Sequence, residues 1–292
     1  MKYGYYPGCC LNSTCKDFDI SMRSVFRQLQ VDIEEVRNWV CCGSSAVHVA
    51  SRYLSAALPL DSLAKAQKQG LDEVLVPCAA CYARFKMALH DINGDSGLRR
   101  EAEQALKHHF TDQLKVIHPL ELFDTDEMRK RIVKSRKRDL SSLKVVCYYG
   151  CYLSRIPDHF ENAEFPQSMD RLVEATGARV IDWGYRTDCC GGSLSITRTD
   201  IAHKLSHDVL ESAKEAGAEA IVVACPFCHM NLDARQGEIE ARFETNYGIP
   251  VYYYSQIMAA ALGAPEKELM LQLHFVKPQT VMQKAGTYDK QQ

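Results

Sequence analysis

The sequence predicts an α/β protein that is internally duplicated, with two similar lobes of largely parallel sheet related by a pseudo-twofold axis and cysteine clusters at the strand C-terminal ends. The first observation behind this prediction is that strand patterns alternate with helix patterns along the chain, which favours parallel pairing. The second is an uncommon Cys-Cys-Gly motif at 41–43 that returns at 189–191. We therefore expect an N-terminal cysteine-rich domain at 1–125, a basic linker or helix at 126–143 and a C-terminal cysteine-rich domain at 144–292.

Short apolar runs rich in aromatic and β-branched residues mark the strands of the first half. The run at 2–6 ends at a proline-glycine pair, so its strand is expected to place Cys9 on a tight turn. A long helical pattern at 44–69 contains Pro59, which is expected to break or kink the helix. The expected strands are 2–6, 32–40, 73–77 and 115–118, with a loop at 10–15 and helices at 22–29, 44–69, 101–110 and from 119.

The second half repeats this order of elements. Its first strand ends at a tyrosine-glycine pair followed by Cys151, much as the first strand of the chain ends before Cys9. Between the halves, the charged stretch 126–139 is expected to form a solvated interdomain helix or linker, and a docking surface for an acidic partner is the alternative. The expected strands are 143–149, 178–183, 219–224 and 250–254, and the expected helices are 168–176, 200–216 and 256–262.

The composition excludes several classes of protein. A net charge of −2 gives no support for nucleic-acid binding, which usually requires a strongly basic domain. The sequence has no run of about 18 or more apolar residues, so no direct membrane span is expected. The first residues lack the apolar core of a signal peptide. We therefore expect a cytoplasmic protein that reaches a membrane only through its partners.

Thirteen cysteines are many for a chain without an export signal. Stable disulfides are rare in a reducing cytoplasm, so clustered cysteines indicate metal or redox chemistry rather than a disulfide framework. Ten of them form two sets in the same order: a cysteine after a glycine, an adjacent pair and a C-x-x-C. The first set is Cys9, Cys41, Cys42, Cys78 and Cys81, and the second is Cys151, Cys189, Cys190, Cys225 and Cys228.

The spacing within the two sets is similar. Thirty-one residues separate the first two members of the N-terminal set, against 37 in the C-terminal set, and 35 against 34 separate the third member from the fourth. Because secondary-structure units of similar length fill these intervals, all five sulfurs of a half are expected to follow strand ends. That edge of a parallel sheet is where ligands bind. Helix N-termini and glycine-rich turns there offer N–H groups that stabilise thiolates and anionic clusters.

The residues favour iron–sulfur clusters at both sites but leave other chemistry open. Zinc takes four tetrahedral ligands, whereas each set offers five thiolates, two of them adjacent in sequence. A cluster with several irons can use adjacent cysteines and an additional ligand. Zinc in at least one half, or redox dithiols without a metal, are the alternatives.

The repeated pattern resembles the HdrB-type subunits of heterodisulfide reductases and their relatives, the tandem Cys-Cys-Gly (CCG) proteins, over essentially the whole chain. The resemblance implies two noncubane [4Fe–4S] clusters that face each other across the lobe interface, with reductive cleavage of a disulfide between them. It also implies two redox partners, an iron–sulfur subunit (HdrC-like) and a flavoprotein subunit (HdrA-like). The cluster ligands it implies are Cys9, Cys41, Cys42, Cys78, Cys81, Cys151, Cys189, Cys190, Cys225 and Cys228.

Residues outside the two sets suggest supporting roles. His229 follows the last cysteine directly and His48 lies near the first pair, so either can assist thiol release by donating a proton or a hydrogen bond, with a structural role as the alternative. Cys147 lies on an apolar strand and is expected to be a small buried residue. Cys10 and Cys15 have no predicted role.

Two other functions compete with disulfide chemistry. Similar tandem proteins serve as electron-transfer subunits in succinate/fumarate-type or lactate/glycolate-type dehydrogenases that feed a quinone pool. A structural scaffold with zinc in one half is the third hypothesis. The chain lacks a nucleotide-binding glycine motif, so a flavin or nicotinamide must come from a partner.

Overall fold

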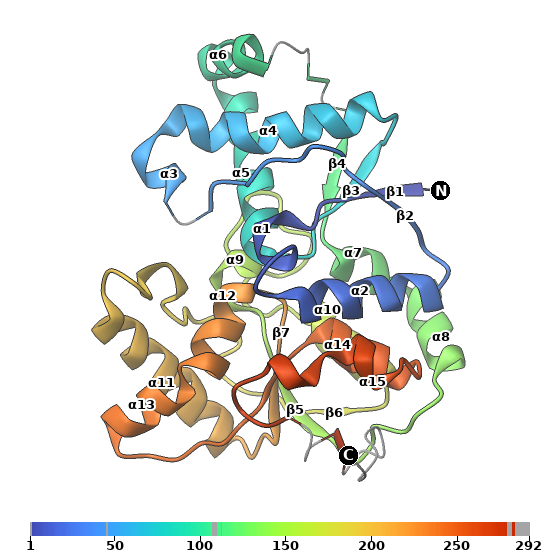
Figure 1. Ribbon diagram of the computed structural model, residues 1–292, viewed down its shortest axis with the longest axis vertical. Helices are drawn as coiled ribbons and strands as arrows, with labels where there is room; N and C mark the ends of the chain where they lie inside the picture. The colour runs from blue at the N-terminus through green and yellow to red at the C-terminus, as the bar shows by residue number, and fades with distance from the viewer. Residues whose placement is uncertain (1, 45, 107–109, 112, 279–281, 284–292) are drawn as a thin grey trace.

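Two four-stranded parallel sheets form the framework of the molecule (Figure 1). The computed structural model describes residues 2–44, 46–106, 110–111, 113–278 and 282–283. The first sheet has the order β2-β1-β3-β4 and the second the order β6-β5-β7-β8. The strands are β1 (Lys2–Tyr5), β2 (Asp32–Glu35), β3 (Glu73–Leu75), β4 (Lys115–Ile117), β5 (Lys144–Tyr148), β6 (Arg179–Val180), β7 (Ala220–Val223) and β8 (Val251–Tyr253).

The two sheets have the same topology. In each, the first strand of the half pairs in parallel with the second and the third, and the third pairs with the fourth. All four residues of β7 are buried, as expected for a central strand covered on both faces. The predicted duplicated α/β fold is therefore confirmed, whereas the domain limits 1–125 and 144–292 stay a prediction.

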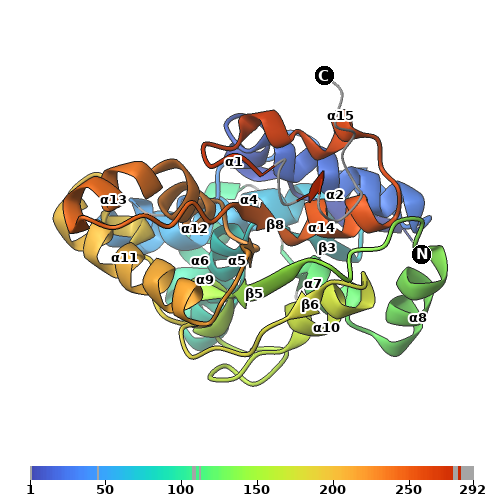
Figure 2. The ribbon, with the colours of Figure 1, turned by 90° about the horizontal axis from the view of Figure 1, so that it is seen from below.

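Helices cover both sheets and connect the two halves. Figure 2 shows α2 beside α14 and α15, and α11 beside α13. Within the described residues, no helix is long and apolar enough to cross a bilayer. In the first half and the connection the helices are α1 (Gly8–Leu11), α2 (Lys16–Gln28), α3 (Val47–Ala50), α4 (Arg52–Lys68), α5 (Ala79–Gly94), α6 (Ser96–Leu106), α7 (Pro119–Phe123) and α8 (Asp126–Ser135). In the second half they are α9 (Gly150–Ser154), α10 (Ser168–Ala175), α11 (Thr199–Glu215), α12 (Pro226–His229), α13 (Gln236–Phe243), α14 (Tyr254–Ala261) and α15 (Glu266–Leu269).

The contact between α2 and α14 joins the halves through buried side chains. The Phe18 ring stacks on the Tyr253 ring with centroids 4.2 Å apart, and the hydroxyls of Ser21 and Ser255 hydrogen-bond at 2.6 Å. Aromatic stacking and a satisfied buried hydrogen bond both favour one fixed arrangement. The two sheets are therefore held in a defined relation to each other.

Several predicted element limits are wrong for local reasons. The strand expected at 32–40 ends at Glu35, because the chain turns away at Asn38, where φ is +55°. The helix expected at 44–69 is interrupted at Ser51, which is extended and whose side chain accepts a hydrogen bond from the Leu54 N–H. The helix α4 then continues through Pro59, so the predicted break does not occur there.

Other differences concern helix starts. The loop expected at 10–15 contains the end of α1, and α2 begins at Lys16 rather than at position 22. The helix expected at 101–110 begins earlier, at Ser96, and is described to Leu106; residues 107–109 lie outside the described residues, and Phe110, its predicted end, is not helical. The strand expected at 178–183 is reduced to β6, Arg179–Val180.

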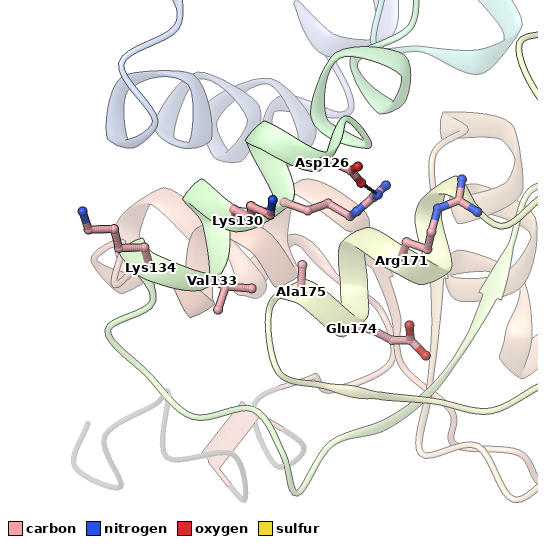
Figure 3. A pocket seen from close by; sticks show the side chains of 8 residues that line it. Asp126, Lys130, Val133, Lys134, Arg171, Glu174 and Ala175 are labelled. Carbon is pink, nitrogen blue, oxygen red and sulfur yellow. Dashed lines mark hydrogen bonds and ion pairs between the residues drawn. The ribbon is translucent and has the colours of Figure 1, made fainter.

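The charged stretch that follows the first half forms α8, which packs against α10 (Figure 3). A pocket of about 470 Å³ lies between the two helices, and Lys130, Lys134 and Arg171 are among its lining residues. The Arg171 guanidinium donates to the Asp124 carboxylate at 2.9 Å, which ties the second half to the connection. This contact fits the interpretation of an interdomain helix, whereas docking of an acidic partner stays a prediction.

His118 makes the fold sensitive to acid. Its side chain is fully buried, Nε2 lies 2.8 Å from the Pro77 carbonyl oxygen and Nδ1 accepts the Leu120 N–H at 3.2 Å. Burial lowers the pKa of His118 from 6.5 to about 3. Between those pH values the unfolded chain binds a proton that the folded chain does not, so stability falls as pH falls, by up to about 1.4 kcal/mol per pH unit.

We therefore expect the free energy of unfolding to fall less for His118→Gln than for the wild type when the pH is lowered from 6.5 to 5. Anaerobic denaturant unfolding of both proteins at each pH gives the two free energies of unfolding. The other histidines contribute equally to both proteins, so the difference between the curves reports His118. Parallel stability curves for the variant and the wild type would contradict the assignment.

Candidate metal centre

The strands place the predicted cysteines at one edge of each sheet. Cys9 lies in α1 directly after β1, and Cys78 precedes α5 directly after the neighbouring β3. In the second half, Cys151 lies in α9 after β5, and Cys225 precedes α12 after β7. Carboxyl ends of adjacent parallel strands meet at the same edge, so these cysteines converge.

The first predicted set is brought together. The Cys9 and Cys41 sulfurs lie 3.8 Å apart, and the Cys42 and Cys81 sulfurs 3.1 Å apart. Cys78 completes the set through a hydrogen bond between its side chain and that of Cys81. These separations exceed the roughly 2.05 Å of a disulfide bond, so the set consists of free thiols.

The second predicted set shows the same pairs. The Cys151 and Cys189 sulfurs lie 3.9 Å apart, and the Cys190 and Cys228 sulfurs 3.7 Å apart. The side chains of Cys225 and Cys228 hydrogen-bond to each other. The duplicated sequence motif thus has a duplicated geometry, pair by pair.

Two glycines allow the chain to approach these sulfurs closely. Gly8 and Gly150 precede the first cysteine of each set and have φ values of +70° and +63°. A Cβ atom would lie 3.2 Å from the Cys81 sulfur at Gly8, and 3.1 Å from the Cys228 sulfur at Gly150. Both the left-handed backbone and the close approach therefore require glycine.

The thiols within each set alter one another's pKa values. Contact with Cys42 and Cys190, respectively, raises the pKa of Cys81 and of Cys228 well above the usual range. The hydrogen bond from Cys151, with one from the Gly191 N–H at 3.3 Å, lowers the pKa of Cys189 to about 6. Buried thiols in contact cannot all ionise unless positive charge compensates them.

This arrangement fits an iron–sulfur cluster in each half. Five convergent sulfurs exceed the four ligands of a tetrahedral zinc ion, and cluster irons are bound by cysteine thiolates. The structure therefore supports the ligand chemistry that the sequence predicts, although the ligand assignments themselves stay a prediction.

The two sets meet at the boundary between the halves. The Ala79 N–H donates to the Ala224 carbonyl oxygen at 3.3 Å, which joins the two C-x-x-C turns. The backbone of Ala80 also hydrogen-bonds to the Cys225 side chain and contributes to lowering its pKa, after the larger effect of Cys228. Sequence spacing carried no signal for this contact, because each turn follows its own strand.

The two predicted histidines have different surroundings. His229 is buried, stacks on Tyr253 with centroids 4.4 Å apart, and has no hydrogen-bond partner at Nε2. His48 lies half-buried on α3, where burial and then Arg84 lower its pKa. Among the described contacts, none joins His48 to a cysteine. A catalytic role for either histidine stays a prediction.

The cysteines outside the sets fall into two groups. Cys147 is buried on β5, as expected for a packed strand residue. Cys10 and Cys15 hydrogen-bond to each other and line a pocket of about 370 Å³ that also contacts Phe227 and His229. Sequence reasoning missed this pocket because its walls come from separate segments of both halves.

Comparison with known proteins gives a family and a fold. The chain matches the family described as CCG, cysteine-rich domain, over residues 3–86 and 145–233. It is 27% identical to the 8-methylmenaquinol:fumarate reductase membrane anchor subunit of Wolinella succinogenes, over 92% of this chain and 95% of that protein. It is 28% identical to the B-type subunit of the ferredoxin/F(420)H(2)-dependent CoB-CoM heterodisulfide reductase of Methanosarcina acetivorans, over 94% of each.

Among solved structures, a hypothetical protein from Helicobacter pylori is similar with a TM-score of 0.77. The match covers 94% of this chain and 52% of that protein at 11% sequence identity. At this identity the likeness concerns the fold alone.

Proposed function

The chain belongs to the family of the cysteine-rich CCG domain, and from this premise we propose that it is the catalytic iron–sulfur subunit of a heterodisulfide-reductase-like complex. Relatives named as B-type subunits of heterodisulfide reductases support a redox iron–sulfur role and membership of a complex. In our proposal, the substrate is a disulfide or thiol and the chain is an oxidoreductase acting on sulfur.

The observation that carries the proposal is the pairwise repetition of sulfur contacts in the two halves. Each set would hold one noncubane [4Fe–4S] cluster, and each cluster supplies one-electron redox capacity. Reductive cleavage of a disulfide consumes two electrons and two protons and releases two thiols, so two equivalent sites meet its electron requirement. The proposed ligands are Cys9, Cys41, Cys42, Cys78 and Cys81 in the first set, and Cys151, Cys189, Cys190, Cys225 and Cys228 in the second.

The exposure of the proposed ligand cysteines would decide from which side a redox partner can reach the clusters. Cys9 and Cys41 are exposed, whereas Cys78 and Cys225 are buried beside the boundary of the halves. An exposed edge lets a redox partner approach the first site. The proposed partners are an HdrC-like iron–sulfur subunit and an HdrA-like flavoprotein, in a cytoplasmic complex.

A single-turnover experiment tests the proposed function. The anaerobically reconstituted chain is reduced with titanium(III) citrate, freed of reductant and mixed with a panel of small disulfides. We expect thiols to be released in proportion to the electrons stored, about two thiols for each electron pair. If no disulfide in the panel releases thiols from a fully loaded, reduced chain, disulfide chemistry is excluded for that panel and the alternative below gains support.

The alternative is an electron-transfer subunit of a succinate/fumarate-type or lactate/glycolate-type dehydrogenase that feeds a quinone pool. The observation that favours it is the relative named as a fumarate reductase membrane anchor subunit, which matches this chain over nearly its whole length. Co-purification with a flavoprotein of the succinate dehydrogenase type, together with cluster oxidation by a quinone analogue and no thiol release, would favour this function.

A further inference from the structure

Three side chains from separate segments converge beside the second cysteine set. They are Asp17 of α2, His229 at the end of α12 and His274 in the C-terminal segment, and we refer to them as the Asp–His–His cluster. One nitrogen or oxygen atom from each lies within 4.8 Å of the other two. Asp17 Oδ2 lies 3.5 Å from His274 Nε2, and the two imidazole rings meet edge to face with centroids 4.8 Å apart.

The cluster is buried and its hydrogen bonding is incomplete. The Asp17 and His274 side chains are 4% and 0% exposed, and His229 is 9% exposed. His229 Nε2 and His274 Nδ1 are buried without a hydrogen-bond partner. Buried polar atoms are almost always satisfied in folded proteins, so two unpaired nitrogens in one cluster point to a ligand.

The internal repeat provides a comparison for this cluster. Tyr82 follows Cys81 in the first half as His229 follows Cys228 in the second, and its hydroxyl donates to the Glu121 carboxylate at 2.6 Å. His118 occupies the position of Tyr253, the residue before the helix that follows the last strand, and both of its ring nitrogens are bonded. At these two positions the first half pairs its polar side-chain atoms, whereas His229 Nε2 in the second half has no partner.

Two carboxyl groups lie at the cluster: Asp17 belongs to it, and Asp233 binds the segment that carries His274. Within the described ion pairs, the partner of Asp17 is His274. Neutral imidazole is the form that binds metal ions.

Neighbouring groups orient the two histidines. The Asp233 carboxylate accepts the N–H groups of Phe275 at 2.8 Å and Val276 at 3.2 Å, which anchors the segment that carries His274. Tyr253 stacks on His229 with an angle of 11° between the rings. Such support around ligating side chains is typical of metal sites.

The Gln256 side chain occupies a position that a metal ion would need beside His274 Nε2. Its Nε2 lies 2.8 Å from His274 Nε2 and also donates to the Leu269 carbonyl oxygen at 2.8 Å. For His274 Nε2 to bind a metal ion, the amide must turn aside, and it retains its hydrogen bond to Leu269. The alternative ligand atom of His274, Nδ1, has no side-chain partner, but the backbone of Val251 also hydrogen-bonds to this imidazole and competes with a metal ion.

We propose that Asp17, His229 and His274 bind one divalent transition-metal ion, with Zn²⁺ as the first candidate, and that this ion fastens the C-terminal segment to both halves. Two neutral imidazoles and a carboxylate suit zinc, and ligand distances of about 2.1 Å in a tetrahedron separate neighbouring ligand atoms by about 3.4 Å, close to the separation of Asp17 and His274. Asp17, His229 and Cys15 line the 370 Å³ pocket, so water or the Cys15 thiol can supply a fourth ligand from there. The ten cysteines of the two sets take no part.

The test measures zinc separately from iron. The full chain is prepared anaerobically with Zn²⁺ in the medium, passed through gel filtration without chelator, and analysed for both metals and by X-ray absorption at the zinc edge. We expect about one zinc per chain with nitrogen and oxygen neighbours at about 2.0–2.2 Å and at most one sulfur neighbour. Zinc surrounded by several sulfurs, or no zinc above the buffer level, would overturn the proposal.

Variants locate the ion. Asp17→Asn and His274→Ala should lower zinc retention at least about tenfold while iron content stays at the wild-type value, because the cysteine sets are untouched. The exposed histidine variant His90→Ala on α5 is the matched control for adventitious binding and should retain zinc. If His274→Ala loses iron as well, the test rests on Asp17→Asn, which preserves the shape of the side chain. Full zinc retention in a folded Asp17→Asn chain contradicts the proposal.

Discussion

Replacing Cys228 with serine is expected to halve the iron of the anaerobically prepared chain, to about four atoms, because one [4Fe–4S] cluster should be lost. Cys228 is 4% exposed and lies in contact with Cys190 and Cys225, so its replacement removes a buried sulfur from within the second set. The first set lies in the other half and keeps all five thiols. Iron and acid-labile sulfide analysis of the purified variant measures the loss.

Cys147→Ala is the matched control for that experiment. It also removes a buried cysteine from the second half, but Cys147 lies on β5 and belongs to neither set. The control should retain the wild-type iron content. If Cys228→Ser and Cys147→Ala contain equal amounts of iron, Cys228 is not a cluster ligand.

Gly191→Ala is expected to destabilise the second half and to release its cluster. Gly191 has a φ of +76°, and a Cβ atom there would lie 2.7 Å from the Cα of Ala202 on α11. The left-handed backbone alone costs about 1–2 kcal/mol for alanine. Relieving the clash requires a shift of α11 or of the Cys189–Cys190 turn, which adds about 1–3 kcal/mol.

Gly217→Ala separates these two effects. Gly217 also has a φ of +76°, but no atom lies within 4 Å of its Cβ position. Its substitution therefore carries the backbone cost without the clash. Melting temperatures recorded at one scan rate, together with iron content, should place Gly191→Ala clearly below Gly217→Ala, and equal values for the two would show that the close approach to α11 is unimportant.

Much of the candidate site could be predicted because the motif is duplicated. The order of five cysteines in each half, combined with the rule that ligands gather at the carboxyl ends of parallel strands, predicted two sets, and the structure places sulfurs of each set close together, while their role as ligands stays a prediction. The resemblance to the HdrB-type subunits of heterodisulfide reductases is confirmed by relatives that match most of the chain. These predictions needed only local sequence and topology.

Element limits depended on turns, caps and packing contacts that the hydrophobic pattern alone does not reveal. Pro59 is a strong helix breaker in isolation, yet α4 continues through it while packed against α5 and α6. The residues after Glu35 have strand-like composition, but the turn at Asn38 directs them away from the sheet. Tertiary packing accompanies the continuous helix at Pro59, whereas a local turn ends the strand before Asn38.

The Asp–His–His cluster could not be predicted for a related reason. Asp17 and His274 belong to opposite ends of the chain, and no motif spacing connects them. The residues after Leu273 are polar in composition, yet the His274 side chain is fully buried and the Tyr252 hydroxyl donates to the Pro278 carbonyl oxygen. A comparison of the two halves was the one available signal, since His229 replaces Tyr82.

The central claim is that each half holds one iron–sulfur cluster through five cysteines. Iron, acid-labile sulfide and zinc analysis of the anaerobically reconstituted wild-type chain tests it most directly. We predict about eight iron and about eight sulfide per chain, corresponding to two [4Fe–4S] clusters. About four iron together with a zinc ion surrounded by sulfur neighbours, or cysteine sets without iron, would contradict it.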